Sequence, residues 1–434
     1  KYNYIGVGYS TAWIIRYPAE IDGKKVKGID GFLNIKMSRT NAKYVYIEDG
    51  IEELKSGSMD IGAFAHSDII AVRIPDTISH IGDESFLHAA SLKKVIWDGA
   101  SEQSTIGDDA FYGTGITQMD IPDGVDTIGD FAFSSTPLED IQLPDSLEKV
   151  GMGVFYDCNM LTSVDLPQAL DIVPDFFFAE CEQLREVQMG DNIKAIGHYA
   201  FYNTGIKEDS FPENLYFVAY FTDEDMERGR ENEDLNGYEA TWVIRGSNHF
   251  DEFAEYETVR YDRELAVKYY AEKTGIPEEA FKEPVDSNRV WIEGNYYELP
   301  LKSTDFKVSE EWERIPKGCY VGKASKWDEY VNTKTGQILT ISEDLDTGLI
   351  NYITVDYDNN NPCFIILPGG IMPGDAKEHY YHMAQVASIS QLPYSEDEWS
   401  FVVGPKDNPI QCEYYFMINE YGESGVQFRM EFQK

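Results

Sequence analysis

The sequence predicts an α/β-type leucine-rich repeat solenoid, with short parallel β-strands joined by turns or short helices, followed by a mainly β or α+β domain. One observation is a series of phenylalanines spaced 25, 22, 22, 23 and 23 residues apart: Phe86, Phe111, Phe133, Phe155, Phe178 and Phe201. Leu, Ile and Val recur at fixed offsets from them, and a fixed period in the low twenties is typical of a leucine-rich solenoid. Residues 285–434 lack this period and carry short runs rich in Tyr, Ile, Val and Trp.

Each repeat begins with a short strand that alternates apolar and polar positions, as in Ile141-x-Leu143-Pro144 and Val164-x-Leu166-Pro167. Period-two alternation puts the apolar pair on one face of the strand and the middle residue on the other. Proline donates no backbone hydrogen bond, so it ends the strand and turns the chain. Stacking of the repeats would pair these strands in parallel and bury a continuous core.

A second motif follows each strand and has the form Ile/Val-Gly-x-x-Ala-Phe, as in Ile128-Gly129 followed by Ala132-Phe133. The glycine permits a backbone turn that is closed to other residues. We expect the phenylalanine to return inward and to fill the space between successive coils.

The middle residues of the strands should form a ladder on the face that points away from the core. These middle residues are Tyr46, Arg73, Ile96, Asp120, Gln142, Asp165 and Gln188. Because solenoids offer extended binding surfaces of this kind, the ladder is the candidate contact surface for a protein or other macromolecular partner. The alternative is a sheet face that is simply solvated.

The repeat can be written L-x-x-V-x-L-P-x-x-L-x-x-I-G-x-x-A-F, and six copies between residues 72 and 206 follow it. It resembles the BspA-like leucine-rich repeats of bacterial surface proteins. Three features depart from the pattern: Val173-Pro174-Asp175 where glycine is expected, a short insertion at residues 98–105, and loss of the strand pattern after Ile206. The resemblance implies an exported bacterial protein that adheres to host proteins, host glycans or neighbouring cells.

Both ends of the solenoid are expected to be irregular. Asp22-Gly23 supplies a tight turn between two short strands near the start. A helix is predicted over residues 263–274, with Gly275 as its C-terminal stop. We therefore predict a capped solenoid over residues 1–283 and a β-rich domain over residues 284–434. The strand candidates of the second domain are residues 290–292, 296–299, 337–341, 352–355, 363–367, 400–403, 413–417 and 426–430.

Composition excludes some classes of partner. The chain has 36 basic and 77 acidic residues, a formal charge of −41, which argues against nucleic acid and anionic membranes because both need basic patches. No apolar run approaches the roughly 18 residues needed to span a bilayer, and no signal peptide is present. The chain begins at Lys1 rather than Met, so we expect that a leader has been removed.

Motifs for catalysis, metals or cofactors are not evident, so the favoured interpretation is non-enzymatic and without a cofactor. Cys319 followed by His379 or His382 has the order of a cysteine peptidase dyad, and two histidines three apart could bind a metal. The rival hypothesis is therefore that residues 284–434 form a hydrolase or small-ligand module with the solenoid as a spacer. Five cysteines occur, Cys158, Cys181, Cys319, Cys363 and Cys412; the first two share an offset in adjacent repeats and are either small buried side chains or a pair.

Overall fold

The structure is a computed structural model that forms two compact units, Lys1–Glu231 with Tyr256–Asp262 and Asn232–Glu255 with Arg263–Lys434. The residues that it describes are 4–6, 13–30, 42–55, 62–222, 258–282, 289–292, 295–298, 301–308, 310, 312–319, 325–332, 338–356, 365–366, 399–403, 410–418 and 424–432. These units are compact parts of the structure, and a compact part need not fold alone. The predicted domain boundary between residues 283 and 284 therefore stays a prediction.

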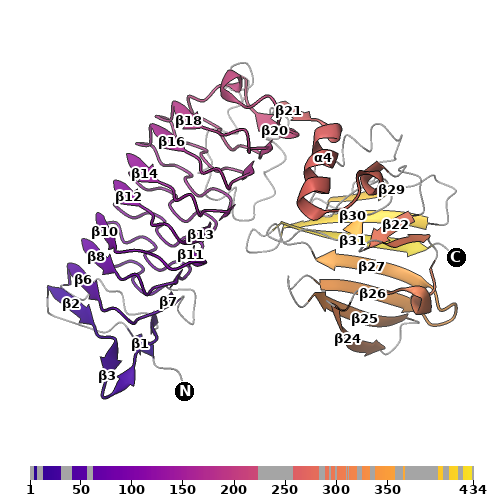
Figure 1. The fold of residues 1–434 in the computed structure, drawn as a ribbon, viewed down its shortest axis with the longest axis horizontal. Coiled ribbons are helices and arrows are strands. Elements are labelled where there is room, and N and C mark those ends of the chain that lie inside the picture. The colour runs from indigo at the N-terminus through magenta and orange to yellow at the C-terminus, as the bar shows by residue number, and fades with distance from the viewer. Residues whose placement is uncertain are drawn as a thin grey trace. The chain divides into compact units, whose positions relative to one another are not determined.

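The first unit is a solenoid in which one row of parallel strands contains the predicted alternating segments (Figure 1). We call it the first row: β2 (Ile14–Tyr17), β6 (Tyr44–Ile47), β8 (Ala71–Ile74), β10 (Lys94–Trp97), β12 (Gln118–Asp120), β14 (Asp140–Gln142), β16 (Ser163–Asp165) and β18 (Glu186–Gln188). Equivalent residues of neighbouring coils lie opposite each other, as Val45 does Val72 and Met119 does Ile141. This confirms the parallel leucine-rich solenoid.

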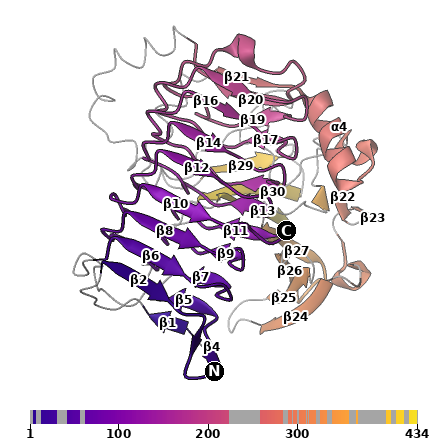
Figure 2. The ribbon, with the colours of Figure 1, turned by 60° about the vertical axis from the view of Figure 1, so that its left-hand side comes forward.

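A second row of parallel strands, which sequence reasoning treated as turns, lies beside the first (Figure 2). Its strands are β1 (Tyr4–Gly6), β5 (Gly28–Asp30), β7 (Glu53–Lys55), β9 (His80–Ile81), β11 (Ser104–Ile106), β13 (Val125–Ile128), β15 (Lys149–Val150), β17 (Ile172–Val173), β19 (Ala195–Ile196) and β20 (Phe217–Tyr220). The Ile or Val of the Ile/Val-Gly motif ends five of these strands and is largely buried, as Ile106 and Ile128 are. The solenoid wall therefore carries strands on two sides and little helix.

The last coil continues beyond Ile206, where the sequence pattern fades. A short 3-10 helix, η2 (Glu208–Ser210), stands where a first-row strand would begin. The second row nevertheless adds β20, which pairs in parallel with β19 and antiparallel with β21 (Thr258–Tyr261). At this end of the solenoid, β21 therefore runs opposite to the strands of the second row.

The core follows the phenylalanine period. Neighbouring rings stack with centroids 5.0–6.0 Å apart, and the stack contains Phe64, Phe86, Phe111, Phe133, Phe155, Phe178 and Phe201. All of these rings except that of Phe201 are fully buried. Full burial of such a side chain contributes about 1.5–3 kcal/mol, so the stack connects the coils energetically as well as geometrically.

The N-terminal turn is the predicted hairpin. Strands β3 (Glu20–Ile21) and β4 (Lys24–Lys25) pair antiparallel. Asp22 and Gly23 between them have φ of 52° and 73°, which is the left-handed backbone that a two-residue type I′ turn requires.

Cys158 and Cys181 are free, buried thiols, so the small-side-chain interpretation is correct and the pairing alternative is wrong. Cys158 donates from Sγ to the carbonyl of Phe133 at 3.2 Å, and Cys181 to that of Phe155 at 3.0 Å. Burial raises the pKa of the Cys181 thiol, which keeps it protonated and unreactive. The side chains of Cys319 and Cys412, and all of Cys363, lie outside the described residues.

The described part of the second unit begins with the predicted helix, α4 (Arg263–Thr274), which Gly275 follows with φ of 72°. A 3-10 turn, η4 (Glu278–Lys282), comes next. Val267 on α4 packs with Ile276, Ala280, Phe281 and Trp291 in a small core. No helix of the described residues is long and apolar enough to cross a membrane.

The other described strands of this unit pair antiparallel, and they confirm the predicted β-rich character. Its strands are β22 (Arg289–Ile292), β23 (Asn295–Glu298), β24 (Trp312–Cys319), β25 (Ser325–Asn332), β26 (Ile338–Asp344), β27 (Ile350–Asp356), β28 (Ile365–Ile366), β29 (Trp399–Val403), β30 (Ile410–Ile418) and β31 (Ser424–Phe432), with another 3-10 turn, η5 (Ser303–Asp305). Sequence reasoning missed β24 and β25. Both are rich in charge, and β24 contains Pro316, where the pairing with β25 shifts register; proline weakens a strand prediction for that reason.

Candidate partner-binding surface

The predicted ladder lies along the outward side of the first row. Tyr46 pairs with Arg73, which pairs with Ile96; Asp120 pairs with Gln142. In the same way Asp165 pairs with Gln188. All seven side chains are exposed except that of Arg73, which is partly covered. The structure thus places these residues on one face, and their role in binding stays a prediction.

Sequence reasoning missed a second column of outward-pointing residues, which lie two positions earlier in each strand. Its members are Ile14, Tyr44, Ala71, Lys94, Gln118, Asp140, Ser163 and Glu186. The period-two alternation extends to these positions, so the same signal could have found them. We call the outward residues of both columns, together with Arg16 on β2, the strand face.

The strand face divides into two chemically different halves. The half on β2, β6, β8 and β10, which we call the aromatic–basic half, contains Ile14, Arg16, Tyr44, Tyr46, Ala71, Arg73, Lys94 and Ile96. Of ten exposed large apolar side chains in the described part of the chain, this half holds Ile14, Tyr44, Tyr46 and Ile96, which are 63%, 45%, 41% and 44% exposed. Trp13, directly before β2, is another. None of these eight outward residues is acidic.

The half on β12, β14, β16 and β18, which we call the acidic half, has the opposite character. It contains Gln118, Asp120, Asp140, Gln142, Ser163, Asp165, Glu186 and Gln188. Four of the eight are carboxylates, and none is basic or apolar. In the described part of the chain, these four carboxylates form no ion pair with a basic side chain.

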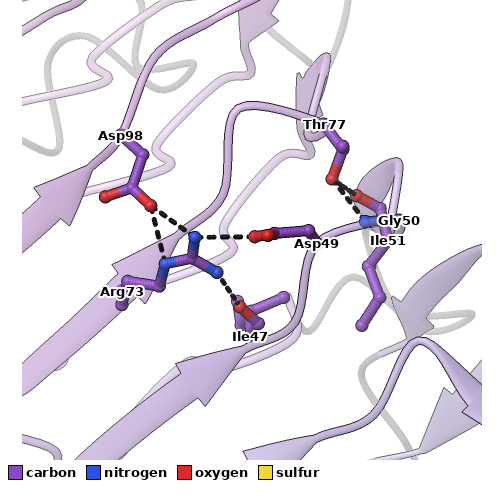
Figure 3. Close-up of polar contacts among 7 residues, drawn as sticks. All are labelled: Ile47, Asp49, Gly50, Ile51, Arg73, Thr77 and Asp98. Atoms are coloured by element: carbon purple, nitrogen blue, oxygen red, sulfur yellow. Dashed lines mark hydrogen bonds and ion pairs between the residues drawn. The ribbon is translucent and has the colours of Figure 1, made fainter.

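Arg73 holds the centre of the aromatic–basic half in place (Figure 3). Its Nε donates to Asp98 Oδ2 at 2.8 Å, and its Nη1 to the Ile47 carbonyl at 2.7 Å. Its Nη2 lies 2.6 Å from Asp49 Oδ1 and also contacts Asp98. Partial burial acts to lower the pKa of Arg73, but the hydrogen bonds to Asp49 and Asp98 outweigh it and raise the pKa.

The loop beside this guanidinium is fixed by a second set of contacts, also drawn in Figure 3. The Thr77 hydroxyl donates to the Ile51 carbonyl at 2.8 Å and accepts from the Gly50 amide at 2.9 Å. Gly50 has φ of 103°, a backbone conformation that favours glycine. Asp49 is therefore presented to Arg73 by a turn that the next coil secures.

Tyr46 lies between two guanidinium groups. The Arg73 guanidinium carbon is 4.9 Å from the centre of the Tyr46 ring, and that of Arg16 is 5.5 Å away. Arg16 in turn pairs with Glu48 at 2.5 Å. The hydrogen bond from the Ala19 amide, assisted by Arg16, lowers the pKa of Glu48. Because cation–π contacts restrain the ring, the exposed tyrosine is presented in a defined orientation.

The alternative site in the C-terminal part is not assembled by any described residue. His379 and His382 lie outside the described residues, and so does the side chain of Cys319. Within the described part of the chain, no group of three or more His, Cys, Asp or Glu side chains could hold a metal ion. The peptidase and metal hypotheses remain sequence predictions.

Comparison with known families confirms the character of the repeats. Residues 38–102 and 104–222 match the BspA type leucine rich repeat region, in six copies. The repeat array is a BspA-type leucine-rich repeat region, as the sequence resemblance predicted. No curated protein matches the chain.

Three solved bacterial structures are similar to parts of the chain. A leucine-rich repeat protein from Bacteroides ovatus is 28% identical over 48% of this chain and 54% of its own, with a TM-score of 0.39. The T. pallidum leucine rich repeat protein is 22% identical over 54% and 88%, with a TM-score of 0.35. A leucine rich cell surface protein from Faecalibacterium prausnitzii is 17% identical over 46% and 82%, with a TM-score of 0.21. The match thus spans about half the length of the Bacteroides ovatus protein.

Proposed function

We propose that this chain, whose repeat array is of the BspA type, is a non-enzymatic, exported bacterial surface protein that binds a protein partner in adhesion or host interaction. The observation that carries the proposal is the clustering of exposed Tyr44, Tyr46, Ile14 and Ile96 on one sheet face of a strongly acidic chain. A surface of this kind is unusual on a soluble protein unless it is a contact site.

The residue types favour a protein partner. Tyrosine and arginine are enriched at the energetic centres of protein interfaces, and charged residues other than arginine are depleted there. Tyr46, with Arg16 and Arg73 on either side, has the residue types of such a centre. Because Arg73 is already held by Asp49, Asp98 and Ile47, binding would not have to order its side chain, which favours affinity.

Location at the cell surface is part of the same proposal and is supported by the BspA type of the repeats. No cofactor is required, because the strand face offers contact area rather than a reacting group.

The test is binding of the full chain to purified extracellular-matrix proteins and to intact host and bacterial cells, by surface plasmon resonance and flow cytometry. Saturable binding is expected, and Tyr46→Ala should weaken it by roughly tenfold or more, as for a residue at the centre of an interface. Tyr296→Ala is the matched control, since Tyr296 on β23 is 46% exposed but lies in the second unit. Equal binding by both variants, with both folded by circular dichroism, would contradict the proposal.

A further inference from the structure

We infer that the strand face binds its partner in two parts, with an apolar anchor on the aromatic–basic half and a lysine- or arginine-rich segment on the acidic half. The inference rests on the proposed function and adds the chemistry of the partner. It starts from the segregation of the sixteen outward residues. Basic, aromatic and branched apolar side chains occur only on β2 to β10, and carboxylates only on β12 to β18.

The two arginines of the first half are engaged within the protein. Arg73 forms four contacts with Asp98, Asp49 and Ile47, and its side chain is only 18% exposed. Arg16 pairs with Glu48. These guanidinium groups therefore position Tyr46 and are neutralised by the carboxylates beside them. The surface left for a partner is aromatic and apolar, with Lys94 as its remaining basic side chain.

The carboxylates of the acidic half are not neutralised in this way. Asp140 accepts a hydrogen bond from Gln142 at 3.2 Å, and Glu186 accepts one from Gln188 at 2.6 Å. An amide donor does not offset a negative charge. Asp120 and Asp165 occupy the middle column beside these pairs. Four carboxylates on neighbouring strands thus produce a negative field that a basic segment would relieve.

The dimensions suit one continuous segment. Neighbouring strands lie about 4.8 Å apart, so the face from β2 to β18 spans roughly 35 Å. An extended chain at about 3.3 Å per residue covers that length with on the order of ten residues. A segment with a few apolar residues followed by several lysines or arginines would reach both halves.

The charge of the chain argues against two other partners for the strand face, a second copy of the chain and an acidic protein. A second copy of this chain would bring two molecules of formal charge −41 together. It would place the acidic half against either an apolar half or another acidic half. An acidic partner would be repelled by the acidic half and by the whole chain. A basic partner is instead attracted at a distance, which speeds association at low salt.

The test uses the full chain and two synthetic peptides of about twelve residues and equal composition. In the block peptide, Ile, Tyr and Trp precede a run of Lys; in the alternating peptide, the same residues are interspersed. The variant is Asp120→Asn with Asp165→Asn. Its control is Asp145→Asn with Glu182→Gln, which removes the same charge from exposed positions in turns outside the strand face.

The block peptide should bind more tightly than the alternating peptide. The Asp120/Asp165 pair of substitutions should weaken its binding by roughly fivefold, as two exposed ion pairs would, and the control pair should leave it almost unchanged. Equal losses in both variants would show diffuse attraction to an acidic protein and would overturn the inference. Binding of a neutral oligosaccharide that depends on Tyr46 but not on Asp120 and Asp165 would also overturn it, as would dimerisation of the chain through this face in sedimentation.

The two proposals fail separately. If Tyr46→Ala abolishes binding of a surface protein while the Asp120/Asp165 variant binds normally, the two-part partner is wrong and the proposed function stands. If neither variant alters binding, both are wrong.

Discussion

Arg73 shows how one side chain can serve both the fold and the candidate site. A guanidinium is a rigid fork, so it can bind Asp98, Asp49 and the Ile47 carbonyl at once. Its guanidinium carbon meanwhile lies 4.9 Å from the centre of the Tyr46 ring. A lysine at this position would offer a point charge without the fork or the flat face, so it could not hold the same three partners and the ring together.

Glu180 is a carboxylate that the fold disfavours in its charged form. Burial raises its pKa, the nearby Asp157 and Glu182 add to the rise, and a 2.6 Å hydrogen bond from Asn203 opposes it. A folded-state pKa above the unfolded value means that the contribution to stability is complete below the unfolded pKa. It is lost as the pH rises through the folded pKa.

We therefore predict that Glu180→Gln raises the free energy of unfolding at pH 7 and flattens its fall between acid and neutral pH. The glutamine carbonyl can still accept from Asn203. The measurement is urea unfolding at several pH values. Glu182→Gln removes the same charge from an exposed neighbour; if it stabilises the protein equally, general repulsion rather than burial of Glu180 is the cause.

At the scale of the repeat element, aspartate and glycine positions in successive coils depend on each other. The Asp108 amide donates to Asp83 Oδ1 at 3.0 Å, and the Asp130 amide donates to Asp108 Oδ1 at 2.7 Å. A glycine in the next coil, such as Gly129, lies against each folded-back aspartate. The fifth copy has Pro174 instead of glycine, and the corresponding residue of the preceding coil is Met152. Glycine therefore occurs where an aspartate of the preceding coil fills the space that a Cβ atom would need.

This coupling predicts that Gly129→Ala is strongly destabilising. The added Cβ would meet the Asp108 side chain and would lie 2.7 Å from the Asp108 amide nitrogen and 2.8 Å from the Gly107 carbonyl carbon. The backbone must shift, which we expect to cost about 3 kcal/mol. Gly99→Ala is the control, because its Cβ would lie 3.4 Å from Asp76 Cβ, an ordinary contact. Equal unfolding midpoints in urea for the two variants would contradict the steric explanation.

The sequence predicted the structure correctly where a single local pattern determines it. The alternation in Ile141-x-Leu143 predicted both the first-row strand and the exposed Gln142, because a strand with one buried face has a period of two. The second row was missed because segments such as β15 (Lys149–Val150) contain two residues, too few for any period. The Tyr46 environment was also out of reach, since Arg16, Arg73 and their acidic partners come from different coils and no local pattern joins them.

At the scale of the whole molecule, the solenoid is a one-dimensional stack in which each coil contacts mainly its neighbours. This explains how the strand face can change from aromatic–basic to acidic along the array. The outward residues other than Arg73 lie outside the buried core, whereas the inward residues repeat closely from coil to coil. The phenylalanine stack runs beneath both halves, so the two surfaces share one core.

The stack predicts that the effect of losing a ring depends on its position. Phe133 is fully buried, with the ring centres of Phe111 and Phe155 at 5.2 Å and 6.0 Å. Phe133→Ala would leave a cavity at two coil interfaces and should lower the free energy of unfolding by about 3–5 kcal/mol. Phe201, near the end of the array, is only partly buried, so Phe201→Ala leaves a smaller cavity and should cost clearly less. Urea unfolding followed by far-UV circular dichroism measures both. If the two variants lose the same free energy, the rings do not act through contacts between neighbouring coils, and the one-dimensional description of the core is wrong.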